Sequence, residues 1–174
     1  MFVKVSIIMS CYNSQATIGQ SIKSILNQSY ENFELLICDD GSIDGTFREI
    51  EKYSKADKRI SIFKNEKNIG LTKSLNLLIN KSDGKFIARQ DDDDISLSHR
   101  IETQIKVIKD LNLDFATSRA KILGTDKLIP GLSFNLPVSF VMNFKNPFIH
   151  GTLLIKKKIL NDIGNYDERF YYAQ

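Results

Sequence analysis

Four consecutive aspartates, Asp91 to Asp94, follow an apolar segment and precede a sequence with helical spacing. Neighbouring carboxylates repel one another by roughly 1 kcal/mol per close pair in water and by about 4 kcal/mol near a protein surface. A cation would relieve this repulsion, and Mg²⁺ and Mn²⁺ prefer carboxylate oxygens combined with the oxygens of a substrate diphosphate. The alternative interpretation is a solvated acidic turn in which one aspartate caps the next helix.

Two further polar clusters stand where apolar, strand-like runs end. The first is Ser10-Cys11-Tyr12-Asn13, and the second is Asp39-Asp40-Gly41-Ser42. Ligands of open parallel sheets bind beyond the carboxyl ends of the strands, where the loops converge. A carboxylate beside glycine accepts a hydrogen bond from a base or ribose, and a tyrosine offers an aromatic face for stacking. The three clusters together favour a site for a nucleoside diphosphate and a metal ion.

Segments with strand and helix periodicity alternate along the chain and predict the elements that position these clusters. Strands are expected within residues 3–9, 32–38, 60–63 and 84–90, and helices within 14–28, 46–55, 71–79 and 98–111. This alternation predicts an α/β fold with a doubly wound, mostly parallel sheet flanked by helices. The later segments are expected as a strand in 113–118, a hairpin or loop in 121–134, a short helix in 137–144, and a strand that turns into a helix in 151–164.

Composition indicates one globular domain. The 174 residues are 42% hydrophobic and 26% charged, which suffices for a real core. The formal charge is +3, and the basic residues are scattered along the chain without a dense tract, so nucleic-acid binding is not expected. Cys11 and Cys38 lie in apolar segments and are expected as buried thiols in a reducing compartment. No run approaches the ~20 apolar residues of a membrane span, so the prediction is a cytoplasmic domain.

At this point the sequence resembles a known family. The segments "VSIIMSCYNSQATIGQSIKSILNQSYENFELLICDDGSIDGT", "NIGLTKSLN", "GKFIARQDDDDISLSHRIETQ" and "NPFIHGTLLIKKKIL…GNYDERF" are similar, in this order, to inverting family 2 glycosyltransferases of the GT-A fold. The resemblance covers essentially the whole chain. It implies a nucleotide-sugar donor, usually a UDP-sugar, and a DXD-type motif that holds Mn²⁺ or Mg²⁺ on the diphosphate. It also implies a role in cell-surface polysaccharide biosynthesis.

The resemblance also implies roles for individual residues. Arg100 sets the register of the aspartate run, so that Asp91 and Asp93 fall on the two motif positions, with Asp93 as the main metal ligand. Asp92 would lie towards the ribose, Asp94 would cap the next helix, and Asp39 would support its loop. Arg89 would counter the local charge, contact the donor, or form a surface ion pair. The nucleoside pocket would be lined by Ser10, Tyr12, Asn13 and Asp40, with Asp40 accepting a hydrogen bond from the base. For Tyr12 and Asn13, packing under a loop and a helix N-cap are the structural alternatives.

The catalytic base is expected beyond Gln174. In the family, the segment like "GNYDERFYYAQ" leads into an acidic motif that supplies the base, so residues 1–174 are interpreted as a single GT-A domain truncated before that motif. Asp167 and Glu168 precede the position of the base and are interpreted as turn residues. His150 is left between a place near the diphosphate or acceptor and a structural hydrogen bond, and His99 is expected at the surface.

The resulting hypothesis is transfer of a sugar, with inversion, to a glycan, lipid-linked or protein acceptor. The alternatives are a nucleotide-sugar-binding fragment or inactive relative, and a sugar-phosphate nucleotidyltransferase, which should carry a glycine-rich basic loop after the first strand that "SCYNSQAT" lacks. Peripheral association with the inner face of a membrane, through regions outside the chain, stays open. So does a homodimer formed through exposed apolar residues near 153–155 and 170–172.

Overall fold

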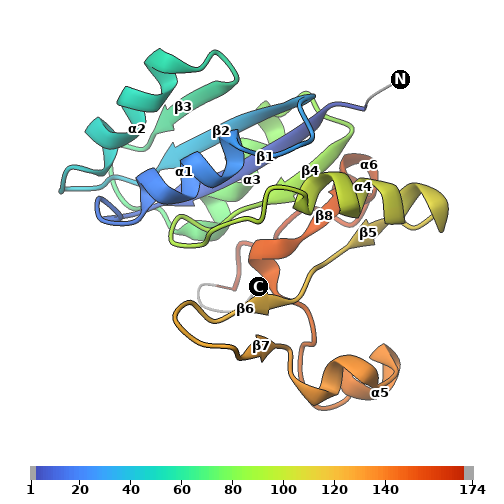
Figure 1. Ribbon diagram of the computed structural model, residues 1–174. Helices are drawn as coiled ribbons and strands as arrows, with labels where there is room; N and C mark the ends of the chain where they lie inside the picture. Colours follow the sequence, from blue (N-terminus) through green and yellow to red (C-terminus); the bar gives the residue numbers. More distant parts are fainter. Residues whose placement is uncertain (1–2, 171–174) are drawn as a thin grey trace.

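The computed structural model describes residues 3–170, in which a six-stranded sheet forms the centre (Figure 1). Its strand order is β3-β2-β1-β4-β8-β5; β1 to β4 are parallel, and β8 runs antiparallel to both β4 and β5. The predicted doubly wound, mostly parallel sheet is therefore confirmed. The strands are β1 (Val5–Cys11), β2 (Phe33–Asp39), β3 (Ile60–Lys64), β4 (Phe86–Arg89), β5 (Phe115–Ala116) and β8 (Leu154–Lys156).

Helices cover both faces of this sheet and create two hydrophobic clusters. One face packs against α1 (Ile18–Leu26), α2 (Thr46–Ala56) and α4 (Arg100–Asp110), and the other against α3 (Leu71–Lys81) and α6 (Lys157–Asp162). Because the central strand β1 is covered on both sides, all seven of its residues are buried. Ile7 and Met9 join the first cluster and Ile8 joins the second. Each such side chain contributes about 1.5–3 kcal/mol through burial.

The chain between β5 and β8 leaves the sheet. It forms a small hairpin of β6 (Ala120–Lys121) and β7 (Leu128–Ile129), then the 3₁₀ turn η1 (Leu132–Asn135) and the short helix α5 (Val138–Val141), and returns through η2 (His150–Thr152). Figure 1 shows β6, β7 and α5 projecting below the main sheet. The predicted hairpin and the predicted short helix are both present.

One expectation about this half is wrong. Leu154 and Ile155 were expected on an exposed apolar surface, yet they are 0% and 6% exposed, because β8 is inserted between β4 and β5 rather than left at an edge. Phe170 is exposed as expected, and residues 171–172 lie outside the described part. Leu154 and Ile155 are therefore not available as a dimer interface.

The strand register brings the ends of β1, β2 and β4 to one edge. Cys11 pairs with Asp39 across β1 and β2, while Ile8 pairs with Arg89 across β1 and β4. The backbone N–H of Asp40 then donates to the Cys11 carbonyl at 2.8 Å. The three polar clusters thus leave the sheet as neighbours, as predicted.

Within residues 3–170, no helix is long and apolar enough to cross a bilayer.

Candidate functional site

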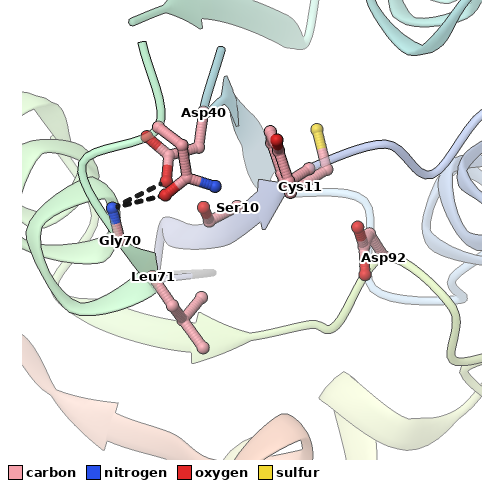
Figure 2. A pocket seen from close by; sticks show the side chains of 8 residues that line it. Ser10, Cys11, Asp40, Gly70, Leu71 and Asp92 are labelled. Atoms are coloured by element: carbon pink, nitrogen blue, oxygen red, sulfur yellow. Dashed lines mark hydrogen bonds between the residues drawn. The ribbon is translucent and has the colours of Figure 1, made fainter. Parts of the chain in front are cut away.

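A cavity of about 330 Å³ lies beyond the carboxyl ends of β1 and β2 (Figure 2). It brings together three polar clusters that are far apart in the sequence, together with the loop that leads into α3. Among the residues predicted for the donor site, Ser10, Tyr12, Asp40 and Asp92 line the cavity, whereas Asn13, Asp91 and Asp93 do not. The lining residues are Ser10, Cys11, Tyr12, Asp40, Asn68, Gly70, Leu71 and Asp92.

Asp40 fixes one side of this cavity. Its carboxylate is almost completely buried and accepts three hydrogen bonds: from Asn65 Nδ2 at 2.7 Å and Ile69 N at 3.0 Å on Oδ1, and from Gly70 N at 2.9 Å on Oδ2. Hydrogen bonds to an ionised acceptor are about twice as strong as neutral ones. Asp40 therefore positions the loop at residues 68–71, a role that the sequence did not indicate. Acceptance of a base N–H by Asp40 stays a prediction.

Asp39 supports its own loop and keeps one acceptor unused. Its Oδ1 accepts from Ser42 N at 3.0 Å, as expected for a loop-supporting residue, whereas its Oδ2 is buried without a hydrogen-bond partner in the described structure. An unsatisfied buried acceptor costs about 1–3 kcal/mol. Asp39 is the register partner of Cys11, which lines the cavity. The only sequence signal for the unpaired Asp39 oxygen is that two aspartates stand next to each other.

The loop after β1 contributes differently from what was predicted. Tyr12 lines the cavity and is 46% exposed. Asn13 has a positive φ of 53° and lies outside the cavity: its backbone N–H donates to Ser42 Oγ and its Oδ1 accepts from Ile43 N. The N-cap alternative for Asn13 is wrong, because Thr17 occupies that position of α1. Asn13 ties the first two loops together.

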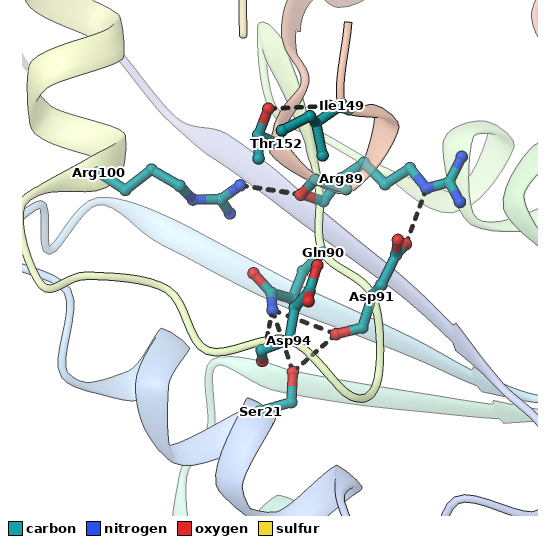
Figure 3. Close-up of polar contacts among 9 residues, drawn as sticks. Ser21, Arg89, Gln90, Asp91, Asp94, Arg100, Ile149 and Thr152 are labelled. Carbon is teal, nitrogen blue, oxygen red and sulfur yellow. Dashed lines mark hydrogen bonds and ion pairs between the residues drawn. The ribbon is translucent and has the colours of Figure 1, made fainter. Parts of the chain in front are cut away.

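The four aspartates occupy four different environments, and Figure 3 shows those of Asp91 and Asp94. Asp91 Oδ1 accepts from Arg89 Nε at 3.0 Å, and Asp92 accepts a hydrogen bond from Ser14 Oγ. Asp93 is exposed, and the Asp94 carboxylate lies beside Gly151. No group of three or more His, Cys, Asp or Glu side chains within residues 3–170 is arranged to hold a metal alone. The donor set fits a cation whose coordination a diphosphate completes.

Two buried arginines balance this acidic loop. Arg89 is only 5% exposed, so its ion pair with Asp91 is not the surface ion pair named among the alternatives. The buried guanidinium counters the negative charge of the aspartate run. Arg100 donates from Nη1 to the carbonyls of Arg89 and Gly151, both at 3.1 Å. Burial lowers the pKa of Arg100 to about 10. Arg100 is the first residue of α4, and a cation in the first turn of a helix interacts unfavourably with the helix dipole. This unfavourable position is a signal in the sequence that Arg100 has a specific role.

The two histidines and the acidic residues near position 167 do not enter the cavity lining. His150 Nε2 lies 2.7 Å from Asn146 Nδ2, and burial lowers its pKa. His99 is exposed as expected. Asp167 is paired with Arg169, and this hydrogen-bonded pair lowers its pKa to about 2, while Glu168 accepts from Asn76 Nδ2.

The aspartate run predicts a pH dependence of stability. Burial is the main cause that raises the pKa of Asp92, and the charges of Asp93 and Asp91 add to it. The folded state therefore holds the proton above the unfolded pKa of about 4, so the free energy of unfolding falls as pH rises through this window. We expect Asp92→Asn to reduce that fall and to stabilise the protein at neutral pH by about 1 kcal/mol or less. Urea unfolding of both proteins across this range is the measurement, and a steeper fall in the variant would contradict it.

The doubly wound sheet, with its cavity at the strand ends and an acidic loop beside it, agrees with the predicted GT-A fold. The family model "Glycosyl transferase family 2" matches residues 6–164. The chain therefore belongs to glycosyl transferase family 2.

Curated relatives agree with this family. The putative glycosyltransferase EpsE of Bacillus subtilis (strain 168) is 34% identical over 94% of this chain. The UDP-Glc:alpha-D-GlcNAc-diphosphoundecaprenol beta-1,3-glucosyltransferase WfgD of Escherichia coli is 38% identical over 72% of this chain. The chain spans 60% of EpsE, and the region matched to WfgD spans 49% of that protein.

Solved structures support the fold. TarS 1-349 of S. aureus superposes with a TM-score of 0.82 at 24% identity, covering 98% of this chain and 52% of that one. The same protein has been solved in complex with UDP-GlcNAc, with a TM-score of 0.79. The mannosyltransferase PcManGT from Pyrobaculum calidifontis, in complex with GDP-Man and Mn²⁺, gives 0.77 at 20% identity, covering 94% of this chain and 47% of that one.

Proposed function

We propose that this chain binds the nucleotide-sugar donor of a glycosyltransferase that transfers a sugar, with inversion, from a UDP-sugar to an acceptor hydroxyl. The observation that carries the proposal is the cavity, because Tyr12, Asp40 and Asp92 reach it from three different loops at the strand ends. The aromatic face of Tyr12 and the buried acceptor of Asp40 suit a base, and the carboxylate of Asp92 suits a ribose beside it. Residues 1–174 would form a single GT-A domain.

Within this proposal, Ser10 and Tyr12 form the nucleoside side of the site. Asp40 holds the loop at 68–71 and accepts a hydrogen bond from the N–H of the base, while Asp39 supports its own loop through Ser42 N. Asn13 keeps the first two loops together, and Asp92 faces the ribose. Removing the Asp40 carboxylate should then weaken nucleoside binding and also loosen the loop at 68–71, whereas removing that of Asp39 should loosen only its own loop.

Asp93 and Asp91 are the proposed ligands of a divalent cation, Mn²⁺ or Mg²⁺. Such an ion, when bound, neutralises charge on the leaving diphosphate. The chain's own contribution is positional: Arg89 holds Asp91 in place, while Asp93 remains exposed to meet the ion. Oxygen ligands from only one or two carboxylates suit Mg²⁺ and Mn²⁺, which retain water or phosphate oxygens.

The base that deprotonates the acceptor is proposed to lie outside residues 1–174. A base must stand within hydrogen-bond reach of the acceptor hydroxyl and bind a proton near the working pH. Asp167 does not meet the second condition, since its hydrogen bonds to Arg169 lower its pKa to about 2. Without that base, residues 1–174 alone would bind a nucleotide-sugar but would not transfer the sugar.

The name of WfgD supports two finer proposals, a UDP-sugar donor and an acceptor linked through a diphosphate to a polyprenol. Radiolabelled UDP-glucose and UDP-N-acetylglucosamine would be incubated with a polyprenyl-diphosphate-linked sugar, using this chain and a longer polypeptide that contains it. The expected result is label in the lipid phase only with the longer polypeptide. Transfer by residues 1–174 alone would contradict the placement of the base, and no transfer by either would contradict the donor and acceptor pair.

The loop that closes the cavity gives a sharp test of the donor site. Gly41 has a φ of +77°, and a Cβ there would come within 2.5 Å of the Lys67 carbonyl carbon and 2.7 Å of Asn68 N. Because these are backbone atoms, Gly41→Ala must displace the loop that lines the cavity. We expect about 2–4 kcal/mol of destabilisation and at least about tenfold weaker UDP binding.

Gly124→Ala is the matched control for this loop. Gly124 has nearly the same φ, +76°, but nothing lies within 4 Å of the added Cβ. It should lose only about 1 kcal/mol and bind UDP normally. Urea unfolding and calorimetry of both variants provide the comparison, and equal effects at the two glycines would rule out the proposed loop displacement.

A further inference from the structure

Exposed apolar side chains gather in the part of the chain that leaves the main sheet. We call residues 117–149 the projecting segment; it contains β6, β7, η1 and α5 (Figure 1). Within the described residues, ten of the 21 exposed large hydrophobic side chains lie here, in less than a fifth of the chain. The most exposed are Leu132 at 90%, Leu123 at 83% and Phe144 at 76%. Such a concentration marks an interaction surface.

The projecting segment also carries the net charge of the protein. It contains four basic residues and one acidic residue, a formal charge of +3, which equals the charge of the whole chain. The remaining residues are therefore neutral as a set. The charged residues of the segment are Arg119, Lys121, Asp126, Lys127 and Lys145. Asp126 pairs with Lys121 at 2.7 Å, and Arg119 lies over the Phe134 ring at 4.8 Å from its centroid.

We propose that the projecting segment docks on the surface of an anionic lipid bilayer. Phenylalanine and leucine side chains enter the interface between headgroups and acyl chains, and lysines nearby are attracted by anionic lipids. The formal charge of +3 on the segment favours an anionic surface. The proposed contact is peripheral, with side chains that enter the interface rather than cross the bilayer.

The attachment of the segment links this surface to the candidate site. At one end, Ser118 N donates to Thr152 Oγ1, and at the other, Gly151 accepts from Arg100 and lies against the Asp91 and Asp94 carboxylates. Docking would hold the acidic loop close to the bilayer. This consequence for a lipid-linked acceptor rests on the proposed function, whereas the docking itself does not.

The test is sedimentation of the 174-residue chain with vesicles of pure phosphatidylglycerol, without nucleotide, and with vesicles of pure phosphatidylcholine as the neutral comparison. We expect strong binding to the first and weak binding to the second. Replacing Leu132 and Phe144 by Ser should reduce binding to the anionic vesicles by at least about tenfold. Replacing Lys127 and Lys145 by Gln should reduce it by about fivefold per residue and only at low salt.

The matched control is the pair Leu111→Ser and Ile163→Ser. These side chains are 66% and 69% exposed and lie outside the projecting segment, so vesicle binding should not change. Equal loss in both pairs, or no binding to anionic vesicles, would overturn the proposal. A dimer in light scattering that disappears in the Leu132 and Phe144 variant, without vesicle binding, would also overturn it in favour of self-association. Failure of UDP binding with intact vesicle binding would contradict only the proposed function.

Discussion

Replacement of Asp93 by Asn should remove most of the Mn²⁺ that the protein binds in the presence of UDP, while the fold remains intact. Asp91 is held by Arg89 and Asp92 by Ser14, whereas Asp93 and Asp94 are exposed, and Asp94 lies beside Gly151. Mutation of outer groups that merely support a metal ligand costs about 10- to 100-fold in affinity, so loss of a ligand should cost at least about tenfold. The measurement is the electron paramagnetic resonance signal of free Mn²⁺ during titration with protein and UDP.

Asp83→Asn is the control for Asp93. Asp83 has a side chain that is 79% exposed, and it lies before β4, at the opposite end of the strand from the cavity. This variant removes the same charge and should leave Mn²⁺ binding unchanged. Equal Mn²⁺ binding by wild type and Asp93→Asn would exclude Asp93 as a ligand and would favour another register of the aspartate run.

Replacement of Arg100 by Met should destabilise the protein by about 2–4 kcal/mol. The side chain is 9% exposed and its charged Nη1 joins the end of β4 to the turn η2 through two carbonyls. Met fills much of the space but donates no hydrogen bond, and the Asp94 and Asp91 charges lose a nearby cation. Urea denaturation at neutral pH measures this loss.

Arg169→Met is the control for Arg100. Arg169 is 87% exposed on its side chain and pairs with Asp167 in solvent, where ion pairs contribute little. We expect no measurable change in stability for this variant. If Arg100→Met lost less than about 1 kcal/mol, relief of the desolvation cost of the buried charge would offset the two lost hydrogen bonds. Arg100 would then not be needed to hold β4 and η2 together.

The first two thirds of the fold could be predicted because its hydrophobic periodicity is strong. Ile18, Ile22 and Ile25 mark α1, and the unbroken apolar run of β1 indicates a strand covered on both faces. The polar residues at the strand ends could be grouped because parallel strands end at one edge. The cavity brings Tyr12, Asp40 and Asp92 together for that reason.

Periodicity does not specify which strand a segment will join or in which direction. The burial of Leu154 and Ile155 follows from the antiparallel insertion of β8 between β4 and β5, a long-range pairing with no local signal. For the same reason, periodicity could not predict the hydrogen bonds of Asp40 to the loop at 68–71 or those of Arg100 to the Arg89 and Gly151 carbonyls. Residue type could not distinguish Asp39 from Asp40, since only the folded hydrogen bonds show that Asp40 is occupied and Asp39 Oδ2 is not.

Calorimetric titration of the 174-residue chain with UDP and with GDP, each with and without Mn²⁺, tests the central claim most directly. We expect that UDP binds, that Mn²⁺ strengthens the binding, and that Asp40→Asn weakens it while Asp83→Asn does not. Absence of binding by either nucleotide, with or without the metal ion, would contradict the assignment of this cavity as the donor site.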